Sequence, residues 1–162
     1  MLPSLRTLVI ATKLLAPTIA AAQSAHPDLS GTWVMDPAKS EQGPLTPQAM
    51  TYTVKQSGNT LVVGRNVTTQ QSASSSTLTY GLDGKVWKNT FTQDGIEIHA
   101  SSTLSWDGPT LVIHTTLQLP DQSTDQTDRW TLGPDGKTLL VSRHVEVTGQ
   151  ELNGKLTFVR KS

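Results

Sequence analysis

The sequence predicts an all-β fold, an antiparallel up-and-down meander of about 8–10 strands closed into a barrel. Runs rich in threonine, valine, leucine and tryptophan recur along the chain, and they lack the 3.6-residue periodicity of amphipathic helices. Short turn signals, mostly Asp-Gly or Asn-Gly, separate these runs. A sheet of about ten consecutive strands curls on itself, and closure removes its exposed edges.

Residues 1–22 are expected to form a signal peptide. This segment has only two charges, Arg6 and Lys13, within a largely apolar sequence. It ends in three alanines, the small-x-small pattern that a signal peptidase requires. Its apolar run is far shorter than the ~20 residues of a membrane span. The sequence therefore predicts a periplasmic or secreted protein without a membrane span, whose single domain covers residues 23–162.

Composition excludes several classes of protein. Without residues 1–22 the chain has 11 basic and 13 acidic residues, a net charge of about −2. This balance gives no electrostatic reason to expect nucleic acid or an anionic membrane as partner. The chain contains no cysteine, so disulfides and thiolate chemistry are excluded. About 140 residues suffice for a single core.

The strands follow from the positions of the turns. The turn signals are Gly58-Asn59, Asp83-Gly84, Asp94-Gly95, Asp107-Gly108, residues 133–136 and Asn153-Gly154. The expected strands are 31–36, 49–57, 60–68, 75–82, 85–93, 96–106, 109–119, 124–132, 137–147 and 150–160. Residues 36–47, with three prolines and a glycine, are expected to form the one long loop, with at most a helical turn.

Two-residue turns fix which residues face each other across a hairpin. They predict these opposite pairs: Tyr80 with Trp87, Phe91 with Ile98, Leu104 with Leu111, Ser101 with His114, Tyr52 with Arg65, and Asp128 with Val141. Independent hairpins place their large apolar side chains on one shared face, which is the consistency expected of a real sheet. That face is predicted to be the inside of the barrel.

Polar residues interrupt the predicted inner face. The registers place Asp128 diagonal to Arg143, within reach of an ion pair, and give Arg65 no acidic neighbour. The two arginines would suit an anionic head group, with aromatic rings around an apolar body. The candidate ligand-binding residues are Tyr52, Arg65, Tyr80, Trp87, Phe91, Asp128, Trp130 and Arg143. In the structural alternative the arginines are half-solvated at a barrel mouth or form an Asp–Arg pair.

Three histidines, His99, His114 and His144, share the opposite face, with His99 predicted diagonal to His114. Histidine and glutamate on adjacent strands can bind Zn²⁺. Because this face is predicted to meet solvent, the three residues are only weak metal candidates, and neither a metal nor a cofactor is predicted. The chain lacks Gly-x-Ser-x-Gly and His-Glu-x-x-His motifs, so no catalytic residue is assigned.

Both ends of the predicted domain resemble the lipocalins and their calycin relatives. Gly31-Thr32-Trp33 matches the Gly-x-Trp entry motif, and Arg160 stands where those proteins carry a basic residue. The resemblance implies a lipocalin-like barrel in which Gly31, Trp33 and Arg160 are structural and Arg160 packs over the Trp33 ring. The chain also resembles small exported lipocalin-like bacterial proteins over residues 31–40 and 129–139. The disulfide common in secreted lipocalins and the Arg-x-Tyr carboxylate clamp of fatty-acid-binding proteins have no counterpart here.

Three functions are compatible with these observations. The first is an exported binding protein for a small apolar or amphipathic ligand, with an anionic amphiphile such as a fatty acid, its head group toward Arg65, as the preferred form. The second is an envelope or secreted interaction or inhibitor module, with a filled barrel and loops that contact a protein partner. The third is an enzyme that uses the barrel interior. An open or a filled interior distinguishes the first two.

Overall fold

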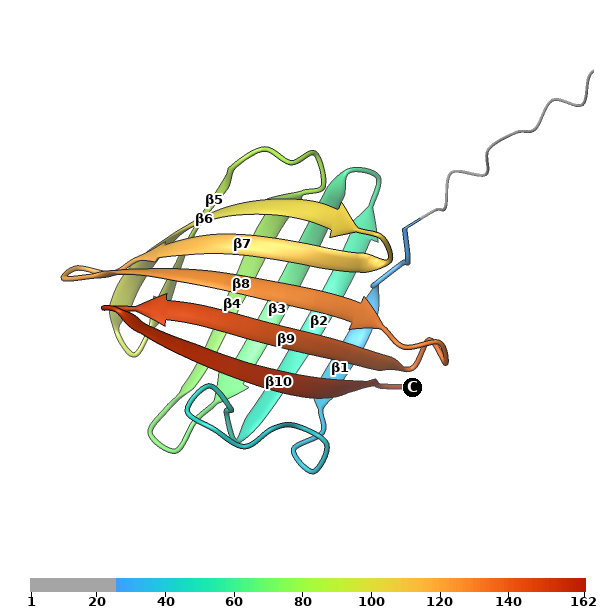
Figure 1. The fold of residues 1–162 in the computed structure, drawn as a ribbon, viewed down its shortest axis with the longest axis horizontal. Coiled ribbons are helices and arrows are strands. Elements are labelled where there is room, and N and C mark those ends of the chain that lie inside the picture. Colours follow the sequence, from blue (N-terminus) through green and yellow to red (C-terminus); the bar gives the residue numbers. More distant parts are fainter. Residues whose placement is uncertain (1–25) are drawn as a thin grey trace, which may run out of the picture.

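A computed structural model describes residues 26–162, and the predicted signal peptide therefore lies outside the described residues. The described chain forms ten strands, shown in Figure 1. They are β1 (Gly31–Met35), β2 (Ala49–Ser57), β3 (Thr60–Thr68), β4 (Ala73–Gly81), β5 (Trp87–Gln93), β6 (Ile96–Asp107), β7 (Thr110–Gln118), β8 (Ser123–Leu132), β9 (Thr138–Val147) and β10 (Gln150–Arg160). The predicted all-β antiparallel meander is confirmed, and none of these residues forms a helix long and apolar enough to cross a membrane.

All ten strands belong to one antiparallel sheet in the order β4-β3-β2-β1-β10-β9-β8-β7-β6-β5. The sheet curls so that β6–β10 cross in front of β1–β4 in Figure 1. The first and last strands pair with each other, with Trp33 opposite Arg160. The result is a nearly closed barrel, in which β4 and β5 lie side by side without a backbone ladder.

The seam between β4 and β5 corrects one predicted hairpin, because Tyr80 does not pair with Trp87. A side chain bridges the seam instead: the Asn89 amide donates to the Thr79 carbonyl (2.9 Å), and its oxygen accepts from the Thr79 N–H (2.8 Å). The Trp87 indole donates to Asp83 (3.3 Å) within the connection between the strands. Asp83-Gly84 is therefore part of a longer loop rather than a two-residue hairpin turn.

The other hairpins keep the predicted inner face, some with a shifted register. The Asp94-Gly95 turn is confirmed, with Phe91 opposite Ile98. In the β6–β7 hairpin Leu104 lies opposite Ile113 rather than Leu111, because Pro109 stands in the turn. Proline has no N–H to donate to a ladder, so the turn uses Gly108-Pro109 and each residue of β6 faces a β7 residue two positions further on than predicted.

The β8–β9 register also differs from the predicted one by two residues. The Asp135 carboxylate accepts from the backbone N–H groups of Lys137 (2.9 Å) and Thr138 (3.0 Å), which extends the loop. Asp128 therefore lies directly opposite Arg143 instead of diagonal to it. The turn predicted at Asn153-Gly154 is wrong as well: both residues belong to β10, and the chain turns at Thr148-Gly149, where φ is positive at both residues (46° and 76°).

A buried tryptophan fills one end of the barrel. Trp33 is fully buried, and its indole N–H donates to the Leu29 carbonyl (2.9 Å). The Arg160 guanidinium lies 4.3 Å from the centre of the Trp33 ring, which is the contact that the family resemblance implies. Arg160 also donates to the Ser30 carbonyl at 2.6 Å. Gly31 has a φ of 141°, which L side chains rarely adopt, and a Cβ there would stand 2.9 Å from the Arg160 guanidinium, so both features favour glycine.

The long loop between β1 and β2 lies at the other end of the barrel. It contains turns and no helix, in agreement with its three prolines. It is fastened to β10, because the Thr157 N–H donates to the Ser40 hydroxyl (3.0 Å) and the Thr157 hydroxyl donates to the Lys39 carbonyl (2.9 Å). Leu45 of this loop lies against Gly154 of β10.

Candidate functional site

The barrel encloses a cavity of about 720 Å³ that reaches the end carrying the β1–β2 loop. Residues 42–48 of that loop, residues 69–71 between β3 and β4, and Asp94 between β5 and β6 form its rim. The volume lies in the range of about 300–1,000 Å³ typical of small-molecule sites. The opposite end is filled by the buried side chains around Trp33.

Alternation along the strands builds the cavity wall. On β3, for example, Val63, Arg65 and Val67 face the cavity, as expected for side chains two positions apart. The apolar lining from the strands consists of Met50, Val63, Val67, Leu78, Phe91, Ile98, Ala100, Ile113, Leu117 and Trp130. These side chains would contact an apolar ligand body.

A buried ion pair crosses the lining. Arg143 donates to both oxygens of Asp128 at 2.7 and 2.8 Å, and the two side chains are only 12% and 8% exposed. The Gln126 amide donates to Asp128 as well (2.9 Å), and Arg143 also donates to the Tyr52 hydroxyl (3.4 Å). Burial disfavours the charge of Arg143, but the Asp128 carboxylate outweighs burial and raises the pKa of Arg143. The structural Asp–Arg pair considered above is therefore present.

Arg65 stands in contrast to this pair. It lies opposite Tyr52 on the neighbouring strand, and its guanidinium is 5.5 Å from the centre of the Phe91 ring. Its Nε is buried without a hydrogen-bond partner, and no carboxylate of residues 26–162 forms an ion pair with it. Apart from Asp94 on the rim, the charged lining consists of Arg65, Arg143 and Asp128, which leaves one net positive charge inside the cavity.

The aromatic side chains complete the site. Trp130 stacks on Tyr52 with ring centres 4.8 Å apart, and its indole N–H is buried with no hydrogen-bond partner among residues 26–162. Burial raises the pKa of both Tyr52 and Tyr80 above the ordinary value, so both hydroxyls are neutral. The cavity lining therefore combines apolar and polar side chains, and two buried N–H groups of lining residues, those of Arg65 Nε and Trp130, have no hydrogen-bond partner among the described residues.

The structure brings seven of the eight candidate ligand-binding residues together in the cavity lining. The exception is Trp87, whose ring covers Gly81 beside the seam. Sequence reasoning missed Gln126, although its position two residues before Asp128 places it on the same face. It also missed the contribution of residues 42–48 to the rim, for which the sequence offers no signal beyond the loop itself.

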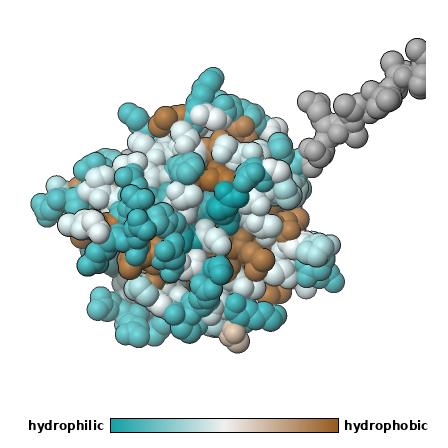
Figure 2. Space-filling model, viewed as in Figure 1, coloured by the Kyte–Doolittle hydropathy of each residue, from teal (hydrophilic) through white to brown (hydrophobic). Residues whose placement is uncertain are grey.

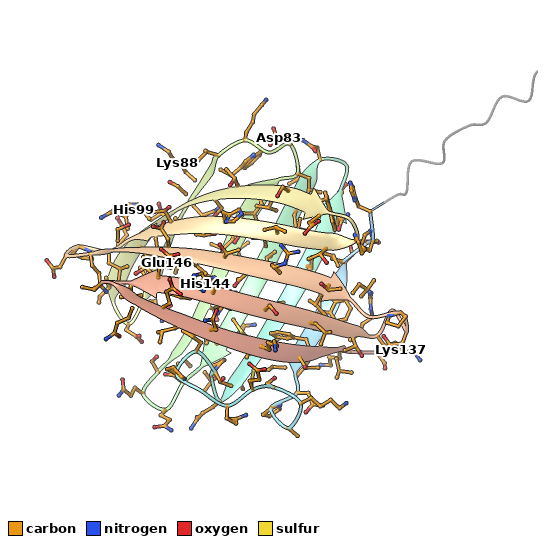
Figure 3. The ribbon with its side chains drawn as sticks, viewed as in Figure 1. Asp83, Lys88, His99, Lys137, His144 and Glu146 are labelled. Carbon is orange, nitrogen blue, oxygen red and sulfur yellow. The ribbon has the colours of Figure 1, made fainter. Side chains whose placement is uncertain are left out.

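The histidines lie outside the cavity. His99 lies opposite Gln118, and His114 opposite Thr103, so the predicted diagonal contact between the two histidines is wrong. The shifted β6–β7 register is the reason. Figure 2 shows the largely hydrophilic outer surface of β6–β10, and Figure 3 places His99 away from His144 and Glu146.

His144 belongs to a small polar group on the outer face. Its Nδ1 lies 2.9 Å from the side-chain amide oxygen of Asn153, and its Nε2 lies 3.2 Å from a Glu146 carboxylate oxygen. These hydrogen bonds, Asn153 first, raise the pKa of His144. Atoms of His144, Glu146 and Glu151 capable of binding a metal lie within 4.8 Å of one another, but the two glutamates are exposed. The group is a solvated surface feature.

Fold and cavity together define a class: a lipocalin-like antiparallel β-barrel that encloses an internal space with a polar cluster. Among solved structures, the chain is similar to secretory abundant heat soluble protein 4 from Ramazzottius varieornatus, with a TM-score of 0.51 and 12% sequence identity. The alignment covers 82% of this chain and 94% of that protein. At this identity the likeness shows the fold. No protein-family model matches the chain, and a search of curated proteins finds no match.

Proposed function

We propose that this protein is an exported binding protein for a small amphipathic molecule, which it holds inside the barrel by an anionic head group. The observation that carries the proposal is Arg65, a guanidinium in the cavity lining without an acidic partner among the described residues. A charge taken out of water is costly unless it is paired, and a bound anion would supply the missing pair. The apolar lining would receive the rest of the molecule.

The cavity volume favours this function over a filled interaction module. An interior packed to the density of a protein core leaves few voids larger than a water molecule, whereas this one leaves about 720 Å³. An enzyme that uses the interior is disfavoured for another reason. Asp128 is the one carboxylate deep in the cavity, and it already accepts three hydrogen bonds from Arg143 and Gln126. A carboxylate so occupied is poorly placed to act as a general base.

The assignment to export rests on the small-x-small pattern that ends residues 1–22. The similar solved structure is that of a protein named as secretory, which agrees with export. Expression of the full chain in a Gram-negative host should yield a periplasmic protein that begins at Gln23. A protein that stays in the cytoplasm with residues 1–22 intact would contradict export.

Ligand binding is tested by titration of the purified protein with straight-chain fatty acids. We expect saturable quenching of tryptophan fluorescence, with Trp130 in the cavity lining as the main reporter. Arg65→Ala should weaken binding about tenfold, or about 1.4 kcal/mol. Arg129→Ala is the matched control, because Arg129 points outward on β8 and should leave binding unchanged. A wild-type protein with no saturable response to any apolar or anionic amphiphile would refute the function and leave the interaction module in its place.

A further inference from the structure

The cavity lining is polar at mid-depth. Six polar side chains, which we call the polar zone, line the cavity between its rim and the filled end: Tyr52, Arg65, Thr115, Gln126, Asp128 and Arg143. Tyr52 of β2 lies opposite Arg65 of β3, and Asp128 of β8 lies opposite Arg143 of β9. Because Arg143 donates to the Tyr52 hydroxyl (3.4 Å), the two pairs lie at a similar depth on facing walls of the barrel.

Apolar side chains line the cavity on both sides of the polar zone. On β3, Arg65 stands between Val67 on the mouth side and Val63 on the side of the filled end, and all three line the cavity. The same order recurs on β7, where the lining residues are Leu117, Thr115 and Ile113. Beyond Val63, Leu61 is fully buried and does not line the cavity. The polar zone therefore separates an apolar mouth compartment from an apolar inner compartment.

The anchor for an acid in the polar zone is the terminal part of the Arg65 guanidinium. No nitrogen of Arg65 donates a hydrogen bond to a residue of the described chain, and only its Nε is sealed from solvent. The two terminal nitrogens therefore keep open surface on a residue that lines the cavity. A carboxylate can accept from both of them in the planar geometry of a guanidinium pair. Arg143 is different, because it already donates to Asp128.

An acid held at Arg65 has apolar space in two directions. Val63 and Val67 are each two positions from Arg65, which corresponds to about 7 Å of strand on either side. An acid at the end of one chain fills one compartment and leaves the apolar walls of the other in contact with water. An acid on an inner carbon sends an arm into each compartment. Arms of four and six carbons advance about 5 and 8 Å, which matches these lengths of strand.

We propose that the ligand is an acid that carries its charged group at an inner position, between two apolar arms. One arm extends toward the mouth and the other toward the filled end, while the acid pairs with Arg65. The proposal rests on the proposed function, because it specifies the ligand of the same cavity. Val67 in the mouth compartment and Leu78, which lies opposite Val63 in the inner compartment, become specificity-determining residues.

Two isomeric acids test the position of the charged group by isothermal titration calorimetry on the intact protein. In 2-butyloctanoic acid the carboxylate lies between a butyl and a hexyl arm, whereas in dodecanoic acid it ends a single chain of the same number of carbons. We expect the branched acid to bind at least about tenfold tighter, which is the effect of about two additional buried methylene groups. In Arg65→Ala the preference should fall below about threefold, because nothing then holds the acid at the depth of the polar zone.

Two variants test the compartments. Val67→Phe reduces the space of the mouth compartment, and Leu78→Phe reduces that of the inner compartment. Each should weaken the branched acid about tenfold, whereas dodecanoic acid, with one arm, should be weakened by only one of them. Asn66→Phe is the matched control, because Asn66 is exposed on the outer face of β3 beside Val67 and should leave both affinities unchanged.

The outcomes separate this inference from the proposed function. Dodecanoic acid that binds as tightly as the branched acid, or tighter, refutes the inner acid and leaves the proposed function intact. A preference that persists in Arg65→Ala refutes Arg65 as its anchor, and a branched acid that both phenylalanine variants bind normally refutes the two compartments. If Leu78→Phe does not fold, the comparison of the isomers in the wild type and in Val67→Phe decides. If neither acid binds, the proposed function falls and this inference falls with it.

Discussion

Replacement of Asp128 by alanine should be far more destabilising than its small size suggests. The change would leave Arg143 buried with only the weak contact of the Tyr52 hydroxyl. Removal of one partner of a buried ion pair costs about 3–5 kcal/mol, because the remaining charge is left uncompensated. We expect about 3 kcal/mol, the lower end, because the guanidinium borders a cavity that water can enter.

The adjacent residue provides the control. Arg129 points to the outer face and forms an ion pair with Asp107 at 2.6 Å, in which the two side chains are 45% and 68% exposed. Exposed pairs contribute about 0–1 kcal/mol, so Arg129→Ala should cost no more than that. Replacing both Asp128 and Arg143 with apolar residues of similar size should recover most of the loss, because no buried charge remains.

Urea unfolding followed by circular dichroism measures these differences. The m-value should stay constant across the series, so that a change in the midpoint reports stability. A loss below about 1 kcal/mol for Asp128→Ala, equal to that of Arg129→Ala, would show that the Asp128–Arg143 pair is effectively solvated. The description of Asp128 and Arg143 as a buried ion pair would then be wrong.

Trp33→Ala should lower the free energy of unfolding by about 3–5 kcal/mol, because the ring is fully buried. Arg160→Ala should lower it by about 1.5–3 kcal/mol, because it removes the contacts of Arg160 with the Trp33 ring and the Ser30 carbonyl. Equal, negligible losses in urea unfolding would refute the contact between Trp33 and Arg160. Burial raises the pKa of Tyr52 and Tyr80, so their neutral forms stabilise the fold below the ordinary pKa of about 10, and this contribution is lost as the pH rises above it. Tyrosinate absorbance should therefore appear together with unfolding at alkaline pH, and a gradual rise near pH 10 in folded protein would contradict their burial. Asn89→Ala should cost about 1–2 kcal/mol and speed hydrogen exchange along the edge of β4, whereas unchanged exchange there would show that the amide does not hold the seam.

The strands and the inner face were predictable because they depend on local signals. Turn residues and a two-residue period decide where a strand begins and which way its side chains point. A register error of two residues leaves this direction unchanged, because side chains two positions apart point to the same face. For this reason Asp128 and Arg143 were assigned to the cavity although their exact pairing was wrong. The presence of a charged cluster was therefore predictable, whereas its geometry was not.

Other features depend on contacts that no local pattern encodes. The seam between β4 and β5 follows from how far the whole sheet curls, and Trp87, which lies opposite Ser102 beside this seam, does not line the cavity. Trp130, whose N–H has no hydrogen-bond partner among the described residues, stacks on Tyr52, which lies six strands earlier in the chain but close across the barrel. Such a contact is visible only once the barrel is closed.

The pairing of the first strand with the last has a consequence for folding kinetics. β1 and β10 are neighbours in the middle of the sheet, and the Lys161 N–H donates to the Thr32 carbonyl, so the two ends of the domain meet. This is the pairing of greatest sequence separation, and separation of that kind slows folding through loop-closure entropy. A circular permutant joined at these ends and opened between β4 and β5 would contain only consecutive strand pairs. It should fold faster than the natural chain order while forming the same barrel.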